Sequence, residues 1–465
     1  MKGRAHPGLN TFLPAKQKAH FSFVVFHSSF VIEPRQGYSK TAPQSITIAL
    51  MKVGARGKKL FPKLLLLLFG IIAGALIAEV ALRVLGYSYP EFYQLDYSRG
   101  YTLRPGMEGW YRKEGDSYVR INSDGLRDRE HSKNKPLDTI RIAVLGDSYP
   151  EALQVTQEQA FWAVMEKQLQ DCGSFGGKKV EVLNFGVSGY GTAQELITLR
   201  KQVWQYSPNI VLLAVTTNND ISDNSLALKK TGEVPYFVYR DGALVLDDSF
   251  RTSRAFRLRQ SFLNRFGRWL KDHSRVVQAL NEGHHGLKIL LGSWRDRLKK
   301  SPPPPAQTQP AAGIPRTEEP GIDNQIYLEP INQAWSDAWN VTAGIVKAMA
   351  AEVKNHGASF VVVTLSNPPQ VFPNEDFRRE FLKRIGAGDI FYPDNRIKAL
   401  SEQAVIPVIN LAPDLQKYAD QRNAFLHGVG ANIGNGHWNA LGHRVAGELL
   451  AGKLCEQMGS LKPKT

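Results

Sequence analysis

The chain of 465 residues is predicted to have an α/β fold, a doubly wound, mainly parallel five-stranded sheet in three layers with helices on both faces. Five short runs rich in β-branched and aliphatic residues predict the strands, and helical patterns between and after them predict the covering helices. The runs are continuously apolar rather than alternating, which is typical of strands buried on both faces. The strand runs are 139–145, 180–185, 209–215, 359–365 and 405–411, and the helical patterns are 158–170, 191–205, 335–355, 395–404 and 438–455.

A transmembrane helix is predicted near the N-terminus, as a signal anchor over residues 60–85. Residues 64–78 carry no charge, and extending the run to Leu82 gives nineteen residues with one acid, about 28 Å of helix at about 1.5 Å per residue. That length nearly spans a hydrocarbon core of about 30 Å. Three lysines precede the run. We therefore expect its N-terminal side in the cytoplasm and the chain beyond residue 86 outside it, on the periplasmic or extracellular side.

Two other interpretations of this apolar run stay open. The small residues 73–75 offer a cleavage site for a signal peptide, and a buried core helix is the third interpretation. Residues 1–59 form a basic N-terminal extension, of which residues 1–50 fit neither an anchor nor a signal peptide. Because a compact basic region begins at Met51, directly before the run, we expect translation to start there.

Beyond the anchor we expect three parts. Residues 86–138 are predicted to form a linker and N-terminal segment, since their start is rich in Tyr, Gly and Pro. Residues 139–455 carry the predicted sheet and its helices, and residues 221–334 form an insertion within them. The insertion begins with a predicted β-hairpin, in which Asp241-Gly242 is a strong turn signal.

The insertion continues with a basic helical stretch, residues 251–300, before a Pro-rich linker at residues 302–305. Basic residues beside an apolar face are typical of helices on an anionic membrane surface, or of a site for an acidic glycan. A surface helix pair whose apolar side packs on the domain is the simpler expectation, and we favour it. The large apolar residues are Phe256, Leu258, Phe262, Phe266, Trp269 and Leu270.

The formal charge of +15 comes from two local blocks. Residues 1–63 carry eleven Lys or Arg against one acid, and residues 251–300 carry thirteen against three, so the rest of the chain is net acidic. This distribution argues against a nucleic-acid-binding protein, and no nucleic acid partner is predicted. Cys172 and Cys455 make neither a disulfide framework nor a metal site. A single bridge would need an oxidising compartment, and two unpaired thiols are the simpler expectation.

Gly146, Asp147 and Ser148 directly follow the first predicted strand, where the chain changes from apolar to small and polar residues. Open α/β sheets place their ligand sites at the carboxyl ends of strands. A glycine there permits a sharp turn and the close approach of a substrate. Taken alone, the tripeptide equally fits a helix cap in which Asp147 organises the turn through local hydrogen bonds.

Three further polar clusters share this placement. Residues 184–192, which include Gly189, follow the second strand, and residues 217–220, which include Asn219, follow the third. His437 lies in a loop near the C-terminus. A doubly wound sheet brings these ends to one edge, an arrangement that suits a nucleophile, oxyanion donors and a base.

Other polar residues receive simpler interpretations. His443 is expected to pack at a helix start, and Asp220 to cap the segment that follows it. His284 and His285 have no carboxylate or cysteine at ligand spacing. We therefore predict no metal site and no cofactor.

The ordered clusters resemble the SGNH, or GDSL-type, esterase and lipase superfamily, over roughly residues 139–220 and 359–450. The resemblance implies a flavodoxin-like three-layer fold and ester hydrolysis with Ser148 as nucleophile and His437 as general base. It also implies an oxyanion hole made by the backbone N–H groups of Ser148 and Gly189 and the side-chain amide of Asn219. The segment from Tyr101 to Asp128 resembles that of membrane-anchored bacterial members.

Two positions depart from the pattern of this superfamily. Thr217 stands where the third block usually begins with Gly. More seriously, Gly434 and Asn435 stand where an Asp is common before the catalytic His, and an amide cannot stabilise an imidazolium as a carboxylate does. The chain therefore needs either a Ser148-His437 dyad with a backbone carbonyl at Nδ1 or an acid from elsewhere, and a weakened or inactive enzyme is the remaining alternative.

The leading hypothesis is a membrane-anchored, exocytoplasmic serine hydrolase acting on acyl esters of glycans or lipids. An O-acyltransferase on a cell-envelope polysaccharide uses the same serine and oxyanion hole and is the first alternative. A catalytically inactive module that binds a glycan through the basic insertion is the second. Substrate, acyl chain length, triad acid and oligomeric state are left open by the sequence.

Overall fold

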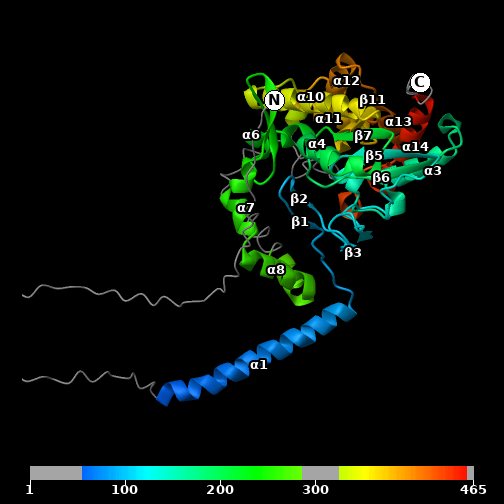
Figure 1. Cartoon of the computed structure of the whole chain (residues 1–465). Helices are drawn as coiled ribbons and strands as arrows, with labels where there is room; N and C mark the ends of the chain where they lie inside the picture. Colours follow the sequence, from blue (N-terminus) through cyan, green and yellow to red (C-terminus); the bar gives the residue numbers. More distant parts are fainter. Residues whose placement is uncertain (1–54, 285–323, 458–465) are drawn as a thin grey trace, which may run out of the picture. The chain divides into compact units, whose positions relative to one another are not determined.

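The computed structural model describes residues 55–284 and 324–457 and contains a parallel five-stranded sheet flanked by helices (Figure 1). The strand order is β11-β10-β7-β5-β6, and every neighbouring pair is parallel. Counted along the chain this order is 2-1-3-4-5, so the predicted doubly wound fold is confirmed. The strands are β5 Thr139–Leu145, β6 Lys179–Asn184, β7 Ile210–Thr216, β10 Ser359–Leu365 and β11 Val408–Asn410.

Helices cover both faces of this sheet, because successive residues of a strand point to opposite sides. In β5, Ala143 and Leu145 belong to one buried cluster, whereas Ile142 and Val144 belong to another. The first cluster is closed by α4 Thr192–Lys201, α10 Gln333–Asn355 and α12 Tyr392–Gln403, and the second by α3 Phe161–Gln170, α13 Ala412–Arg422 and α14 Ala440–Gln457. The sequence patterns did not predict α13 or α11 Glu375–Ile385, which is mostly charged and offers few apolar positions.

The segment before the sheet forms two small antiparallel pairs. They are β1 Tyr93–Asp96 with β2 Gly100–Leu103, and β3 Glu108–Tyr111 with β4 Ser117–Arg120. Phe92, Leu103 and Val119 of this segment are buried with Leu153 and Val187 of the sheet domain. The segment is thus packed on the loops that follow β5 and β6.

A long apolar helix, α1 Ala55–Val84, lies at the predicted place of the membrane anchor. Its residues Pro62–Val84 are long and apolar enough to cross a membrane, and none of the most apolar window is buried. The interpretation of this run as a buried core helix is therefore wrong. The expected start at Met51 lies outside the described residues.

The insertion contains the predicted hairpin, β8 Tyr236–Arg240 paired with β9 Ala243–Asp247. Asp241 and Gly242 have φ angles of 49° and 77°, as the turn signal requires. The chain continues through α7 Arg254–Arg259 and α8 Phe262–His273 and is helical again from Arg275. The Pro-rich linker at 302–305 lies outside the described residues.

The remaining elements are short. The short helices are α2 Ser148–Glu151, α5 Asp220–Asp223 and α6 Leu226–Lys229. Single 3₁₀ turns are Gln157–Gln159, Gly173–Phe175, Val203–Tyr206, Ser249–Thr252, Asn324–Tyr327, Pro368–Val371 and Gly430–Asn432.

The expectation of two unpaired thiols is wrong. Cys172 and Cys455 form a disulfide with their Cα atoms 6.0 Å apart, across 283 positions of sequence. Cys172 lies just after α3 and Cys455 lies in α14, and these two helices pack side by side on the same face of the sheet. Only this packing brings the two sulfurs together.

Candidate active site

Ser148 is the first residue of α2, directly after β5, and is partly exposed. The neighbouring strand β7 leads to Asn219, so the two residues flank the point where the strand order reverses. Asp147 caps the turn, since its Oδ1 accepts the Tyr149 N–H at 3.1 Å and the Thr216 hydroxyl at 2.8 Å. The carboxyl ends of β5 and β7 therefore hold Ser148 at the position where doubly wound sheets bind ligands.

His437 lies beside Ser148. Its Nε2 atom is 2.8 Å from the Ser148 Oγ, within hydrogen-bond reach. The ring packs near Tyr149, with ring centroids 5.2 Å apart, and the His437 side chain is 32% exposed. The serine and the histidine singled out from the sequence, 289 positions apart, are thus brought together.

The other ring nitrogen of His437 is bound by a carboxylate that the sequence did not identify. Glu114 Oε2 contacts His437 Nδ1, and Glu114 Oε1 accepts the His437 backbone N–H at 2.6 Å. Burial alone would raise the pKa of Glu114, but the hydrogen bonds and charge of His437 outweigh it and lower the pKa below 4.5. Glu114 is therefore held as a carboxylate at the position of a triad acid, and Ser148, His437 and Glu114 form one connected chain.

The turn between β3 and β4 delivers Glu114 to this place. Ser117, at the start of β4, donates its hydroxyl to the Leu153 carbonyl. Gly115 lies so close to the chain that a Cβ there would be 2.3 Å from the Gln154 carbonyl oxygen. The hairpin therefore rests on the backbone just beyond α2, and a side chain at position 115 would push Glu114 away from His437.

Asn435 does not take the place of the triad acid, because Glu114 occupies His437 Nδ1. Little in the sequence points to Glu114 for this role, since it lies in a charged turn far along the chain from both partners. Its one hint was the resemblance of the segment from Tyr101 to Asp128 to membrane-anchored proteins of the superfamily. The alternative of an acid from elsewhere agrees with this geometry better than a dyad does.

Asn219 and Gly189 lie at the ends of the strands that flank β5. The Asn219 amide donates to Asp147 Oδ2 at 3.0 Å, which fixes the orientation of that side chain. Gly189 has a φ of 74°, in the left-handed region, and a Cβ there would be 2.7 Å from the Tyr101 hydroxyl. Lys229 donates to the Gly189 carbonyl at 2.7 Å and so anchors this loop from its other side.

A buried carboxyl group supports the Gly189 loop. Glu151, three residues after Ser148, accepts the backbone N–H of Ser188 at 3.0 Å as well as the Ser188 hydroxyl, and it accepts the Tyr93 hydroxyl at 2.9 Å. Burial raises the pKa of Glu151 to about 7, although these hydrogen bonds and the nearby Arg127 act in the opposite direction. Glu151 thus links the N-terminal segment to the loop that carries Gly189.

Asp220 and His443, two further polar residues named from the sequence, are buried in the fold. Asp220 is buried and accepts the Thr216 N–H at 2.7 Å, and burial, with the nearby carboxylate of Glu195, raises its pKa well above 3.8. His443 is buried and stacks on Phe161, as the helix-start interpretation predicts. In residues 55–284 and 324–457 no group of three metal-ligating side chains could hold an ion.

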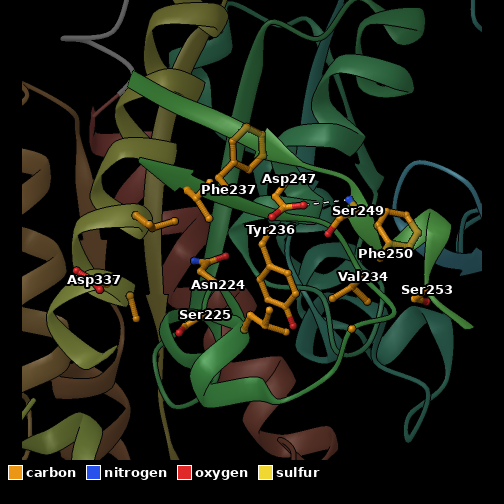
Figure 2. A pocket seen from close by; sticks show the side chains of 15 residues that line it. Asn224, Ser225, Val234, Tyr236, Phe237, Asp247, Ser249, Phe250, Ser253 and Asp337 are labelled. Atoms are coloured by element: carbon orange, nitrogen blue, oxygen red, sulfur yellow. Dashed lines mark hydrogen bonds between the residues drawn. The ribbon is translucent and has the colours of Figure 1, made fainter. Parts of the chain in front are cut away.

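A separate pocket of about 340 Å³ opens beside the β8–β9 hairpin (Figure 2). Tyr236, Phe237 and Phe250 line it with aromatic rings, and Asp247 and Asp337 add two carboxylates to the lining. Ser148, His437 and Glu114 do not line it. The pocket is thus distinct from the Ser148–His437–Glu114 chain.

No family model matches the chain, and no curated protein matches it. Solved structures that resemble it include the acetyl xylan esterase AlAXEase, with 14% identity, a TM-score of 0.33 and coverage of 67% of this chain and 99% of that one. An acetylxylan esterase from Geobacillus stearothermophilus has 10% identity and a TM-score of 0.32, with coverage of 69% and 94%. A lipolytic protein of the G-D-S-L family from Desulfitobacterium hafniense DCB-2 has 11% identity and a TM-score of 0.30, with coverage of 67% and 97%. The sheet order and site geometry of the chain itself carry its functional interpretation.

Proposed function

We propose that this chain is a serine esterase of the SGNH, or GDSL-type, superfamily that hydrolyses acyl esters of glycans or lipids. The observation that carries the proposal is the continuous contact from Ser148 through His437 to Glu114, with Nε2 and Oγ 2.8 Å apart. A serine hydroxyl is a poor nucleophile until a base lies within hydrogen-bond reach, and His437 is such a base.

In this mechanism the Ser148 Oγ attacks the carbonyl carbon of the ester while its proton moves to His437 Nε2. The Glu114 carboxylate holds Nδ1 protonated and stabilises the imidazolium that forms. His437 then gives the proton to the leaving alkoxide, and an acyl-serine remains. Water, deprotonated by His437, attacks the acyl-serine and releases the carboxylic acid and free Ser148.

The negative oxygen of each tetrahedral intermediate needs donors already in place. The backbone N–H groups of Ser148 and Gly189 and the amide of Asn219 take this role in our proposal. Each such donor is worth about 3 to 4 kcal/mol of transition-state stabilisation. Asp147 orients the Asn219 amide in advance, so that little reorganisation is needed when the charge develops.

We further propose that α1 anchors the protein in a membrane with the hydrolase domain outside the cytoplasm. The length and exposure of Pro62–Val84 support an anchor, and the lysines before it support a cytoplasmic N-terminal side. The Cys172–Cys455 disulfide supports the same side for the domain, because disulfides persist in oxidising compartments.

The test uses the full-length protein in detergent with a short-chain nitrophenyl ester. Turnover by the parent and its loss in Ser148→Ala are expected, together with labelling of Ser148 by a fluorophosphonate probe, located by peptide mass spectrometry. Equal turnover by both proteins, or a label on another residue, would overturn the proposal.

A further inference from the structure

Helix α8, Phe262–His273, has two very different sides. Phe262, Phe266, Trp269 and His273 follow one another at three- and four-residue spacing, and their rings form a ladder with centroids 6.3, 5.9 and 4.6 Å apart. Residues at this spacing share one side of a helix. Phe262 is 70% exposed and Trp269 is 51% exposed, so the ladder faces water in the isolated chain.

The opposite side of α8 contacts the hydrolase domain. Asp272 accepts two hydrogen bonds of 2.8 Å from the guanidinium of Arg104, which also donates to the Glu91 carbonyl. Lys271, on the same side, lies 4.0 Å from the Glu91 carboxylate. The helix thus presents its polar side to the domain and its aromatic side away from it. For α8 this is the reverse of the packing favoured from the sequence, because an ion pair and not the apolar side binds this helix to the domain. For α7 the favoured packing holds, since Phe256 is buried against Tyr97 and Phe250.

The end of α8 is bound to the last turns of α1. Arg83 donates to the His273 carbonyl at 2.8 Å. Glu79 accepts the Ser274 hydroxyl at 2.9 Å and the backbone N–H groups of Arg275 and Val276 at 3.0 Å each, so it caps the helix that follows α8. The candidate span ends at Val84. The aromatic ladder therefore begins at the level where that span would leave the hydrocarbon core.

The surroundings have the chemistry of a lipid headgroup region. A cleft of about 470 Å³ beside these contacts is lined by Arg83, Arg275, Tyr87, Trp110 and Tyr118, among others. Trp and Tyr concentrate at membrane–water interfaces, and Arg binds phosphate. Seven basic residues lie along α7 and α8 and just beyond them: Arg254, Arg257, Arg259, Arg265, Arg268, Lys271 and Arg275. Arg259 pairs with Glu233 at 2.6 Å and Lys271 lies near Glu91, whereas Asp272, the one acid in this stretch, is paired with Arg104.

We propose that the aromatic side of α8 lies in the headgroup region of the bilayer that α1 spans, with its basic residues against anionic phospholipids. An interfacial helix with Trp and Phe on one side and Arg and Lys on the other is buried about 5 to 10 Å into this region. This inference rests on the membrane anchoring proposed above and not on the esterase activity. A bilayer fits the surface because the ladder adjoins the end of the span and its flanks are cationic.

The experiment places one fluorophore on each side of α8 in the full-length protein. Leu263→Cys lies on the apolar side and is 77% exposed, and Asn264→Cys is its exposed neighbour on the polar side. Leu76→Cys in α1 serves as the membrane reference. Each variant is labelled with nitrobenzoxadiazole, placed at one copy per nanodisc of phosphatidylcholine and phosphatidylglycerol, and quenched either by shallow nitroxide lipids or by aqueous iodide.

The expected result is several-fold stronger quenching by nitroxide lipid at position 263 than at position 264, with the reverse order for iodide. Phosphatidylcholine alone should weaken the lipid quenching at 263, as should the pair Arg265→Gln and Arg268→Gln. Iodide quenching at 263 equal to that at 264 would overturn the proposal. Protection from iodide at position 263 that appears only with two copies per disc would also overturn the proposal. It would show that a second copy of the chain, and not the bilayer, covers this side of α8.

Two readouts separate this proposal from the others. Water exposure of the label at position 76 would refute the membrane anchor, and the α8 proposal with it. Turnover of the nitrophenyl ester is measured on the same labelled samples. Its absence would count against the esterase proposal alone, since neither labelled position of α8 belongs to the catalytic group.

Discussion

The carboxylate of Glu114 binds both the backbone N–H and the Nδ1 atom of His437, although 323 residues separate the two positions. One side chain thereby fixes the loop that carries His437 and the direction of its ring. Because Glu114 belongs to the β3–β4 hairpin, the segment between α1 and the sheet supplies one member of the Ser148–His437–Glu114 chain and is not a passive linker.

Replacing Glu114 should greatly lower the rate of the proposed hydrolysis. In Glu114→Gln we expect kcat to fall by on the order of 10³- to 10⁴-fold, because an amide neither stabilises the imidazolium nor favours the correct tautomer. Steady-state kinetics with a nitrophenyl ester measure the effect. Asn435→Ala is the matched control, since Asn435 stands at the position expected from the sequence but does not bind Nδ1, and its kcat should stay within a few fold of the parent. A large loss in Asn435→Ala with little loss in Glu114→Gln would reverse the assignment.

The Asn219 amide should act on the transition state rather than on substrate binding. In Asn219→Ala we expect kcat to drop by about 10²- to 10³-fold with little change in KM. Ser222→Ala removes a hydrogen bond of 3.0 Å to the Asn219 carbonyl and leaves the amide in place, so its kcat should remain close to that of the parent. A rise in KM at constant kcat for Asn219→Ala would assign the residue to binding instead.

The buried Glu151 should make stability depend on pH. Its pKa is about 7 in the folded state and close to 4.5 when unfolded, so the folded state binds more protons between these values. Its contribution to stability is therefore greatest in acid and is lost as the pH rises through about 7. Glu151→Gln has no such group to titrate. The difference in the free energy of unfolding between this variant and the parent should therefore shift by about 2 kcal/mol in favour of the variant between pH 5 and pH 8. Urea denaturation at both pH values measures this difference, and a difference that is flat with pH would contradict the expectation.

The disulfide should stabilise the sheet domain, most of which lies between its two cysteines. Cys172→Ser should lower the free energy of unfolding by about 2 to 5 kcal/mol, because the bridge closes a loop of nearly 300 residues in the unfolded chain. Cys455→Ser should have the same effect, and the double variant should be no worse than either single one. Thermal unfolding of the parent with and without reductant gives an independent measure. A Tm that reductant leaves unchanged would show that the bridge is absent or contributes nothing.

Much of the fold was predictable because it follows from local patterns. The runs 139–145 and 359–365 match β5 and β10 at both ends, since a short, mainly apolar run rich in β-branched residues is typical of a buried strand. The last strand is shorter than predicted, Val408–Asn410 instead of 405–411, because Val405 has a φ of 57°, outside the strand region, and Pro407 has no N–H to donate to the ladder. Ser148 and Asn219 were recognisable because both follow strands that a doubly wound sheet places side by side.

By itself the sequence determined the parallel sheet, the apolar helix α1 and the strand-end positions of Ser148, Gly189 and Asn219, because each depends on periodicity or on residues adjacent in the chain. Only the tertiary structure decided which carboxylate meets His437, that the two cysteines pair, and that α8 turns its aromatic side away from the domain. Each of these depends on contacts between distant residues. A charged turn, a lone pair of cysteines and an amphipathic helix look the same in sequence whatever lies opposite them, so their roles follow from packing alone.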